Sequence, residues 1–199
     1  MEIKLKKGLA SFFFIIFVSF AHSSFAQSVS LAFSNASAQF GYGFLVGGGT
    51  FGRTEFGVDA YYHPDDSTYL IDTSLQVFDE VGSKVRGLVA GLGGKIYGAS
   101  TKDDNEMLVI GVGGMLRYAL PMNKRIILGV DAYYAPPVVS FVDANYFYEL
   151  AGRLEYEIIP RASAFVEFRR MTLNIEDDSC GGNNCNIENS PRLGMEINF

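Results

Sequence analysis

Residues 191–199 read Pro-Arg-Leu-Gly-Met-Glu-Ile-Asn-Phe and end the sequence. Within this stretch every second residue is apolar: Leu193, Met195, Ile197 and Phe199. Because successive side chains of a strand point to opposite faces, the pattern predicts a strand with one apolar and one polar face. Such a strand suits a membrane barrel, whose apolar face meets lipid and whose polar face meets the lumen. An ordinary amphipathic strand of a soluble domain shows the same alternation.

The same stretch resembles the terminal assembly signal of Gram-negative outer-membrane β-barrels. In that signal a polar residue, a glycine two places on and two spaced hydrophobic residues lead to a final aromatic. Arg192, Gly194, Ile197 and Phe199 occupy those places. The resemblance implies a protein that periplasmic chaperones deliver to the barrel-assembly machinery, and that then contacts outer-membrane lipid and lipopolysaccharide.

Residues 1–26 have the pattern of a secretory signal peptide. Three lysines lie within the first seven residues, an apolar run interrupted by Ser11 alone follows at 9–18, and Ser24-Phe25-Ala26 supplies small residues at the cleavage-determining places. We therefore predict export and cleavage after Ala26. The alternative of a membrane anchor is less favoured, because a spanning helix needs roughly 18 consecutive apolar residues.

The mature chain, residues 27–199, has the length of one domain and contains no linker-like stretch. Removal of three lysines and one glutamate changes the 16 basic and 22 acidic residues to 13 and 21, a net charge of about −8. This balance argues against a nucleic-acid partner. Glycine at 22 residues and aromatics at 14% suit a chain that contacts lipid through alternate residues, and a soluble β-sandwich is the rival interpretation.

Nine earlier segments alternate in the same way. They lie near residues 28–34, 39–46, 51–63, 69–77, 84–99, 108–118, 125–134, 145–158 and 164–169. Connections near 47, 81, 121 and 159 are short, and those near 63, 100, 135 and 176 are longer, as in barrels with short periplasmic turns and long outer loops. The chain is therefore predicted to be an all-β, transmembrane, antiparallel up-and-down barrel of ten strands. Eight strands are the alternative if residues 28–34 do not form the first.

The inward faces of these strands carry charges of both signs in similar number. The predicted lumen network comprises Arg53, Glu55, Asp59, Asp72, Lys95, Arg117, Arg125, Asp131, Glu149, Arg153, Glu155, Glu157, Glu167, Arg169, Arg192 and Glu196. Side chains nearly fill the interior of a barrel of this size, so opposite charges should meet and pair. A largely closed, ion-paired lumen is expected, with a cation preference in any residual leak.

Two cysteines and one histidine of the mature chain require separate interpretations. Cys180 and Cys185 lie close together in the longest predicted loop, residues 176–190, and should form a disulfide in an oxidising compartment. Their separation is too short for a zinc site. His63, near Asp65 and Asp66 at the predicted outer rim, permits a hydrolase, but a solvated rim histidine is the commoner case.

Residues 129–137, 148–156 and 168–170 resemble the YfaZ family of outer-membrane proteins. The resemblance implies a small outer-membrane barrel and supplies no catalytic residue or cofactor. The leading functional expectation is a non-enzymatic barrel with a structural or narrow-pore role for small solutes or ions. The alternative is a surface-binding barrel that acts through its extracellular loops, and a rim-site hydrolase is a third interpretation.

Overall fold

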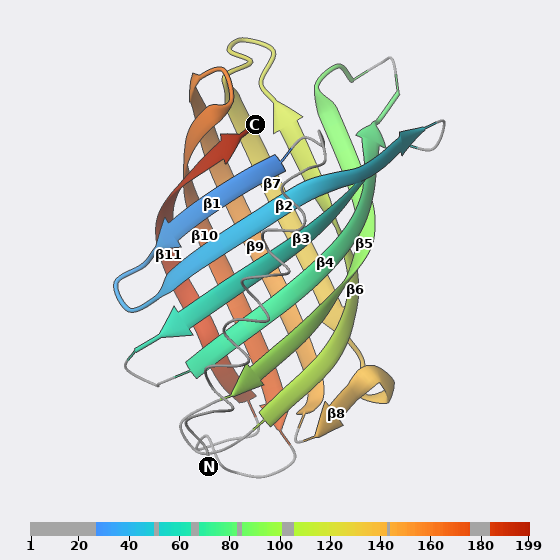
Figure 1. The fold of residues 1–199 in the computed structure, drawn as a ribbon, viewed down its shortest axis with the longest axis vertical. Coiled ribbons are helices and arrows are strands. Elements are labelled where there is room, and N and C mark those ends of the chain that lie inside the picture. Colours follow the sequence, from blue (N-terminus) through green and yellow to red (C-terminus); the bar gives the residue numbers. More distant parts are fainter. Residues whose placement is uncertain are drawn as a thin grey trace, which may run out of the picture.

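The computed structural model describes residues 27–49, 52–64, 68–82, 85–100, 106–142, 144–175 and 184–199. Ten strands of this part form one closed antiparallel barrel (Figure 1). They are β1 (Gln27–Phe33), β2 (Ala38–Gly49), β3 (Gly52–His63), β4 (Thr68–Glu80), β5 (Leu88–Ser100), β6 (Glu106–Ala119), β7 (Ile126–Ala135), β9 (Ala144–Ile159), β10 (Ala162–Ile175) and β11 (Asn184–Asn198). The predicted signal peptide and its cleavage site lie outside the described residues.

Each barrel strand pairs with its neighbours along the chain, and β1 pairs with β11 to close the wall. Their register runs from Ser28 opposite Asn198 to Phe33 opposite Leu193. The weakly patterned segment at 28–34 is therefore the first strand, which confirms ten strands rather than eight. The chain's last residue takes part in this closure, because the Phe199 amide donates to the Gln27 carbonyl oxygen at 2.7 Å.

The outer wall is apolar, as the alternation predicted. The exposed side chains include Leu31, Ile71, Leu92, Val112, Leu128, Leu154, Val166 and Leu193, one or more from each of eight strands. Continuous apolar exposure of this extent suits a wall that contacts lipid. In the described part of the chain no helix is both long and apolar enough to cross a membrane.

The two ends of the barrel differ. At the turn end, which carries the C-terminus at the top of Figure 1, lie the connections at residues 50–51, 81–87, 120–125 and 160–161. At the opposite loop end lie those at 34–37, 64–67, 101–105, 136–143 and 176–183. The first of these is short, because β1 and β2 form a tight hairpin held by hydrogen bonds of Ser34 to Ser37.

Several element boundaries differ from the predictions. β11 begins at Asn184, so residues 184–190, predicted as loop, belong to this strand. The polar residues of that segment concealed the strand pattern. The predicted loop at 135–143 contains a 3-10 turn, η2 (Pro137–Val139), and a short strand, β8 (Ser140–Val142), which pairs with β6 beyond the end of β7. β5 begins at Leu88 rather than near 84, because Gly87 adopts a positive φ of 83° that ends the preceding turn.

Candidate functional site

Four charged side chains meet at mid-height in the lumen and form its central belt. Asp72 comes from β4, Lys95 from β5, Glu149 from β9 and Arg169 from β10, and each is at most 9% exposed. They share the lumen because each occupies an inward position of its strand. Around the ten-strand barrel, β10 lies five strands from β4 in either direction, so this belt spans the bore.

Glu149 is the best satisfied member of the belt. Its carboxylate lies 2.6 Å from Arg169 Nη2 and 3.2 Å from Lys95 Nζ, and the Tyr97 hydroxyl donates to it at 2.5 Å. Asp72, by contrast, lies 3.9 Å from Lys95 and 4.0 Å from Arg169, and neither carboxylate oxygen accepts a hydrogen bond in the described part of the structure. Both cations of the belt therefore favour the same carboxylate.

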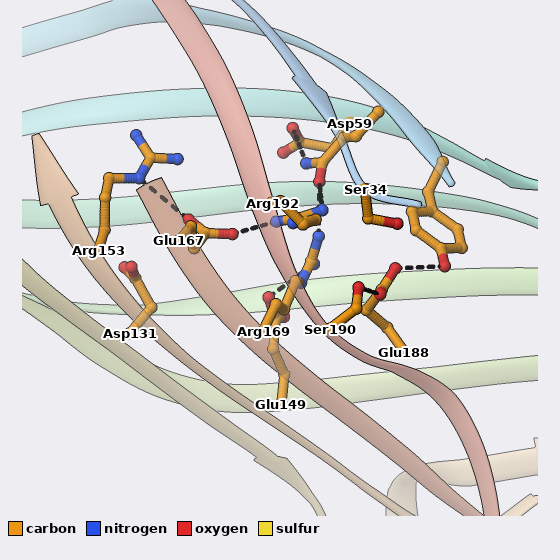
Figure 2. A network of polar contacts seen from close by, with 12 residues as sticks. Ser34, Asp59, Asp131, Glu149, Arg153, Glu167, Arg169, Glu188, Ser190 and Arg192 are labelled. Carbon is orange, nitrogen blue, oxygen red and sulfur yellow. Dashed lines mark hydrogen bonds and ion pairs between the residues drawn. The ribbon is translucent and has the colours of Figure 1, made fainter. Parts of the chain in front are cut away.

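A second group of charges continues from the belt toward the turn end (Figure 2). Arg192 donates to Glu167, and Arg153 bridges Glu167 at 3.0 Å and Glu196 at 3.1 Å. Gln39 connects this group to the belt, since its amide oxygen accepts hydrogen bonds from both Arg169 and Arg192. Each of the two groups holds two cations and two carboxylates, so the buried charges cancel within each group, although Asp72 lies at the limit of ion-pair distance.

Two further contacts complete the polar lining. Nη2 of Arg117 donates to both carboxylate oxygens of Asp131, at 2.8 and 3.0 Å. The Gln39 amide nitrogen donates to Asp59 at 2.7 Å. Of the sixteen predicted network residues, all but Arg125 and Glu157 line the cavity or form an ion pair inside the described part of the barrel. Which of them pair across the lumen was not specified by the sequence.

An apolar layer lies beside the belt on its loop-end side. Each strand from β3 to β7 and from β9 to β11 contributes to it. The layer comprises Tyr61, Leu70, Tyr97, Met107, Val109, Ala135, Ala144, Phe147, Met171, Leu173 and Ile187. The rings of Tyr97 and Phe147 are 4.5 Å apart, which joins β5 to β9 across the interior. The layer was missed, although inward apolar residues near the loop end of several strands, such as Leu70 and Phe147, were its signal.

On the turn-end side of the belt the lumen is hollow. A cavity of about 360 Å³ extends from Lys95, Glu149 and Arg169 toward Arg53 and Phe78 near the turn end. Its lining is predominantly polar and includes hydroxyl groups as well as charges of both signs. The interior is therefore packed in its loop-end half and solvent-accessible in its turn-end half.

A separate buried carboxylate lies near the loop end. Glu188 of β11 accepts hydrogen bonds from the hydroxyls of Tyr61 at 2.5 Å and Ser37 at 2.9 Å. It also accepts one from the hydroxyl of Ser190 (Figure 2). These contacts connect β11 to β3 and to the β1–β2 turn, where β1 has already ended. Sequence reasoning missed this cluster because Glu188 falls in the predicted loop 176–190.

Several predicted residues lie apart from the network. Arg125, predicted to face the lumen, instead lies exposed in the turn before β7, because that strand begins one residue later. Arg53 is exposed, with its guanidinium 5.2 Å from the centre of the Phe78 ring. Glu55, Glu155 and Glu157 are half-buried, and none has an ion pair within 4.0 Å among the described residues.

The residues of the predicted assembly signal occupy distinct environments. Arg192 is buried in the charge network, while Ile197 and Phe199 are exposed on the outer wall. Gly194 packs at the closure, since a Cβ there would lie 2.2 Å from Cζ of Phe165 and 2.6 Å from the Leu31 carbonyl oxygen. Only glycine fits at this position without displacing its neighbours.

Of the residues in the cysteine and histidine predictions, the structure describes Cys185 and His63. Cys185 lies in β11 opposite Leu173, and Cys180 lies outside the described residues, so the disulfide stays a prediction. His63 ends β3 at the loop end, as predicted for the rim. Asp65 and Asp66, its proposed partners, also lie outside the described residues.

Comparison with known proteins identifies a family. The family model described as "YfaZ precursor" matches residues 5–199, and the chain belongs to that family. A search of curated proteins gives no match. Among solved structures, the chain is similar to a "KdgM porin" at 9% identity and a TM-score of 0.45, over 87% of this chain and 99% of that one.

A second similar chain comes from work on the mechanism of in-meso crystallization of membrane proteins. It shares 15% identity with a TM-score of 0.43, over 88% of this chain and 83% of that one.

Proposed function

We propose that this YfaZ-family protein is an integral barrel of a Gram-negative outer membrane, with a structural or narrow-pore role and a lumen closed to general diffusion. The observation that carries the proposal is the succession of two barriers along the bore. The charged belt spans the lumen from β4 and β5 to β9 and β10, and the apolar layer fills the adjoining loop-end half.

Each barrier opposes solute passage for a different physical reason. A polar solute that enters the apolar layer loses hydrogen bonds to water without replacement. A solute that passes the belt must separate buried ion pairs, and an uncompensated charge at such a site costs several kcal/mol. Only small ions or solutes that exploit brief rearrangements should pass, and the excess of acidic residues favours cations.

The exposed apolar wall supports the membrane location, and the paired lumen supports a role without catalysis. The predicted signal peptide and assembly signal are consistent with export and with insertion by the barrel-assembly machinery. In this proposal the lipid and lipopolysaccharide of the outer membrane are the protein's main contacts, and the charges of the lumen serve to hold the wall together.

Planar-bilayer recording of the purified protein tests the proposal. We expect sparse, small, cation-favouring events rather than a steady current. Glu157→Gln alters a half-buried carboxylate of β9 near the turn end and outside the belt, so this variant should give the same events as the unmodified protein. A large, steady, weakly selective conductance of the unmodified protein would contradict a closed lumen.

The β7–β9 connection favours surface binding as a second candidate function. Val138 of η2 is 81% exposed and Phe141 of β8 is 46% exposed, both at the loop end. Apolar side chains held on a short ordered element are suited to contact a partner. Pull-down from intact cells with the purified barrel, compared with a Val138→Ser/Phe141→Ser variant, tests this role. Equal capture by both forms would argue against it.

A further inference from the structure

The unsatisfied carboxylate of Asp72 requires a physical explanation. This side chain is 1% exposed, and neither oxygen accepts a hydrogen bond within the described structure. A buried carboxylate without a donor is costly, so native structures usually provide one. The nearest donor is the Lys95 ammonium, at 3.9 Å, which instead contacts Glu149 at 3.2 Å.

The strand order makes these two acceptors different. Asp72 and Lys95 lie on the neighbouring strands β4 and β5, so a pair between them would lie along one wall. Glu149 lies on β9, three strands from β5, so the present pair reaches across the bore. Arg169 on β10 already pairs with Glu149 on the adjacent strand at 2.6 Å and can compensate it without Lys95.

Resting on the proposed narrow-pore function, we propose that Lys95 is the gate of the lumen and alternates between two carboxylates. In the closed arrangement the ammonium pairs with Glu149 across the bore. In the second arrangement it pairs with Asp72 on its own wall, while Arg169 keeps Glu149. Each wall then holds one complete ion pair, no charge is left uncompensated, and the belt no longer crosses between β5 and β9 through Lys95.

The surroundings of Lys95 suit a short displacement. The ammonium lies 0.7 Å closer to Glu149 than to Asp72, from 3.2 and 3.9 Å. Lys95 Nζ lies over the Tyr133 ring, 4.7 Å from its centre, and a cation–π attraction acts out to about 6 Å from the ring centre, so it can persist over such a movement. Lys95 also lines the cavity on the turn-end side, so a solute or ion entering from there meets it directly.

Opposite substitutions at the two acceptors test the gate. In Glu149→Gln the ammonium should move to Asp72, and bilayer events should become about tenfold more frequent, the effect of exchanging one charge-assisted hydrogen bond. In Asp72→Asn it should remain with Glu149, and events should become rarer by a similar factor. Glu157→Gln, on the same strand as Glu149, should behave as the unmodified protein. Heat-modifiable gel mobility confirms that each variant is folded.

A crystal structure of Glu149→Gln provides a readout independent of conductance. We expect Lys95 Nζ within about 3.2 Å of an Asp72 oxygen. Lys95 remaining near position 149 would overturn the gate, as would equal increases in event frequency from Glu149→Gln and Asp72→Asn. A steady current through the unmodified protein would show that the proposed closed lumen is wrong. The position of Lys95 in the Glu149→Gln structure would then still decide whether Lys95 can move to Asp72. A closed unmodified protein with no response to either substitution would reject the gate alone.

Discussion

The loop-end and turn-end halves of the barrel interior are formed by the same strands but are filled differently. The loop-end half contains the packed apolar layer, which adjoins the almost fully buried charges of the belt at mid-height. The turn-end half contains the cavity and the Arg117–Asp131 pair, whose side chains are 23% and 14% exposed. From this difference we expect that breaking an ion pair costs more free energy of unfolding where water is excluded than where water reaches the charges.

The largest difference should come from removing one arginine from each half. Arg169→Met leaves Glu149 buried without its closest cation and should lower the free energy of unfolding by about 4 kcal/mol. Arg117→Met should cost about 1 kcal/mol, because water reaches Asp131. Urea titration of each variant in lipid vesicles measures both values. Equal losses would show that the two halves do not differ in desolvation.

A somewhat smaller effect is expected in the apolar layer. Phe147→Ala should lower stability by about 3 kcal/mol through a cavity beside Tyr97, and should raise the frequency of bilayer events. Phe168→Ala, on the exposed outer wall, is the matched control and should leave the event frequency unchanged. If the events do not respond to Phe147→Ala, the layer is not a barrier to solutes.

The barrel closure provides a third test. Gly194→Ala places a methyl group against the Phe165 ring and the Leu31 carbonyl and should cost about 2 kcal/mol. Gly152→Ala is the control, since an added Cβ there meets nothing within 4 Å. The yield of heat-modifiable barrel and the urea midpoint measure the difference. Identical behaviour of the two variants would remove the steric role of Gly194.

The smallest effect concerns the predicted disulfide. A bond between Cys180 and Cys185 would close a very small loop and add on the order of 2 kcal/mol to local order. The double substitution to serine should change the stability of the whole barrel by less than about 0.5 kcal/mol. Mass spectrometry of a non-reduced digest checks the bond itself, and two free thiols there would exclude it.

Much of the fold follows from alternation alone. The inward and outward sides of strands such as β4 and β9 can be assigned by counting, because the strand period is two. The boundary of β11 could not be assigned, since Asn186, Asn189 and Ser190 present no apolar face to the pattern. Arg125 was misplaced for a related reason, because counting extends a strand past the point where the turn begins.

Alternation along the chain was sufficient to predict a barrel of ten amphipathic strands with charges of both signs inside. Which of those charges meet became known from the folded structure. Arg169 and Asp72 are brought within 4.0 Å by closure of the wall, although their strands are five apart in either direction. The side-chain period fixes a residue's face, whereas the contacts across a lumen depend on strand tilt and stagger, which belong to the closed barrel as a whole.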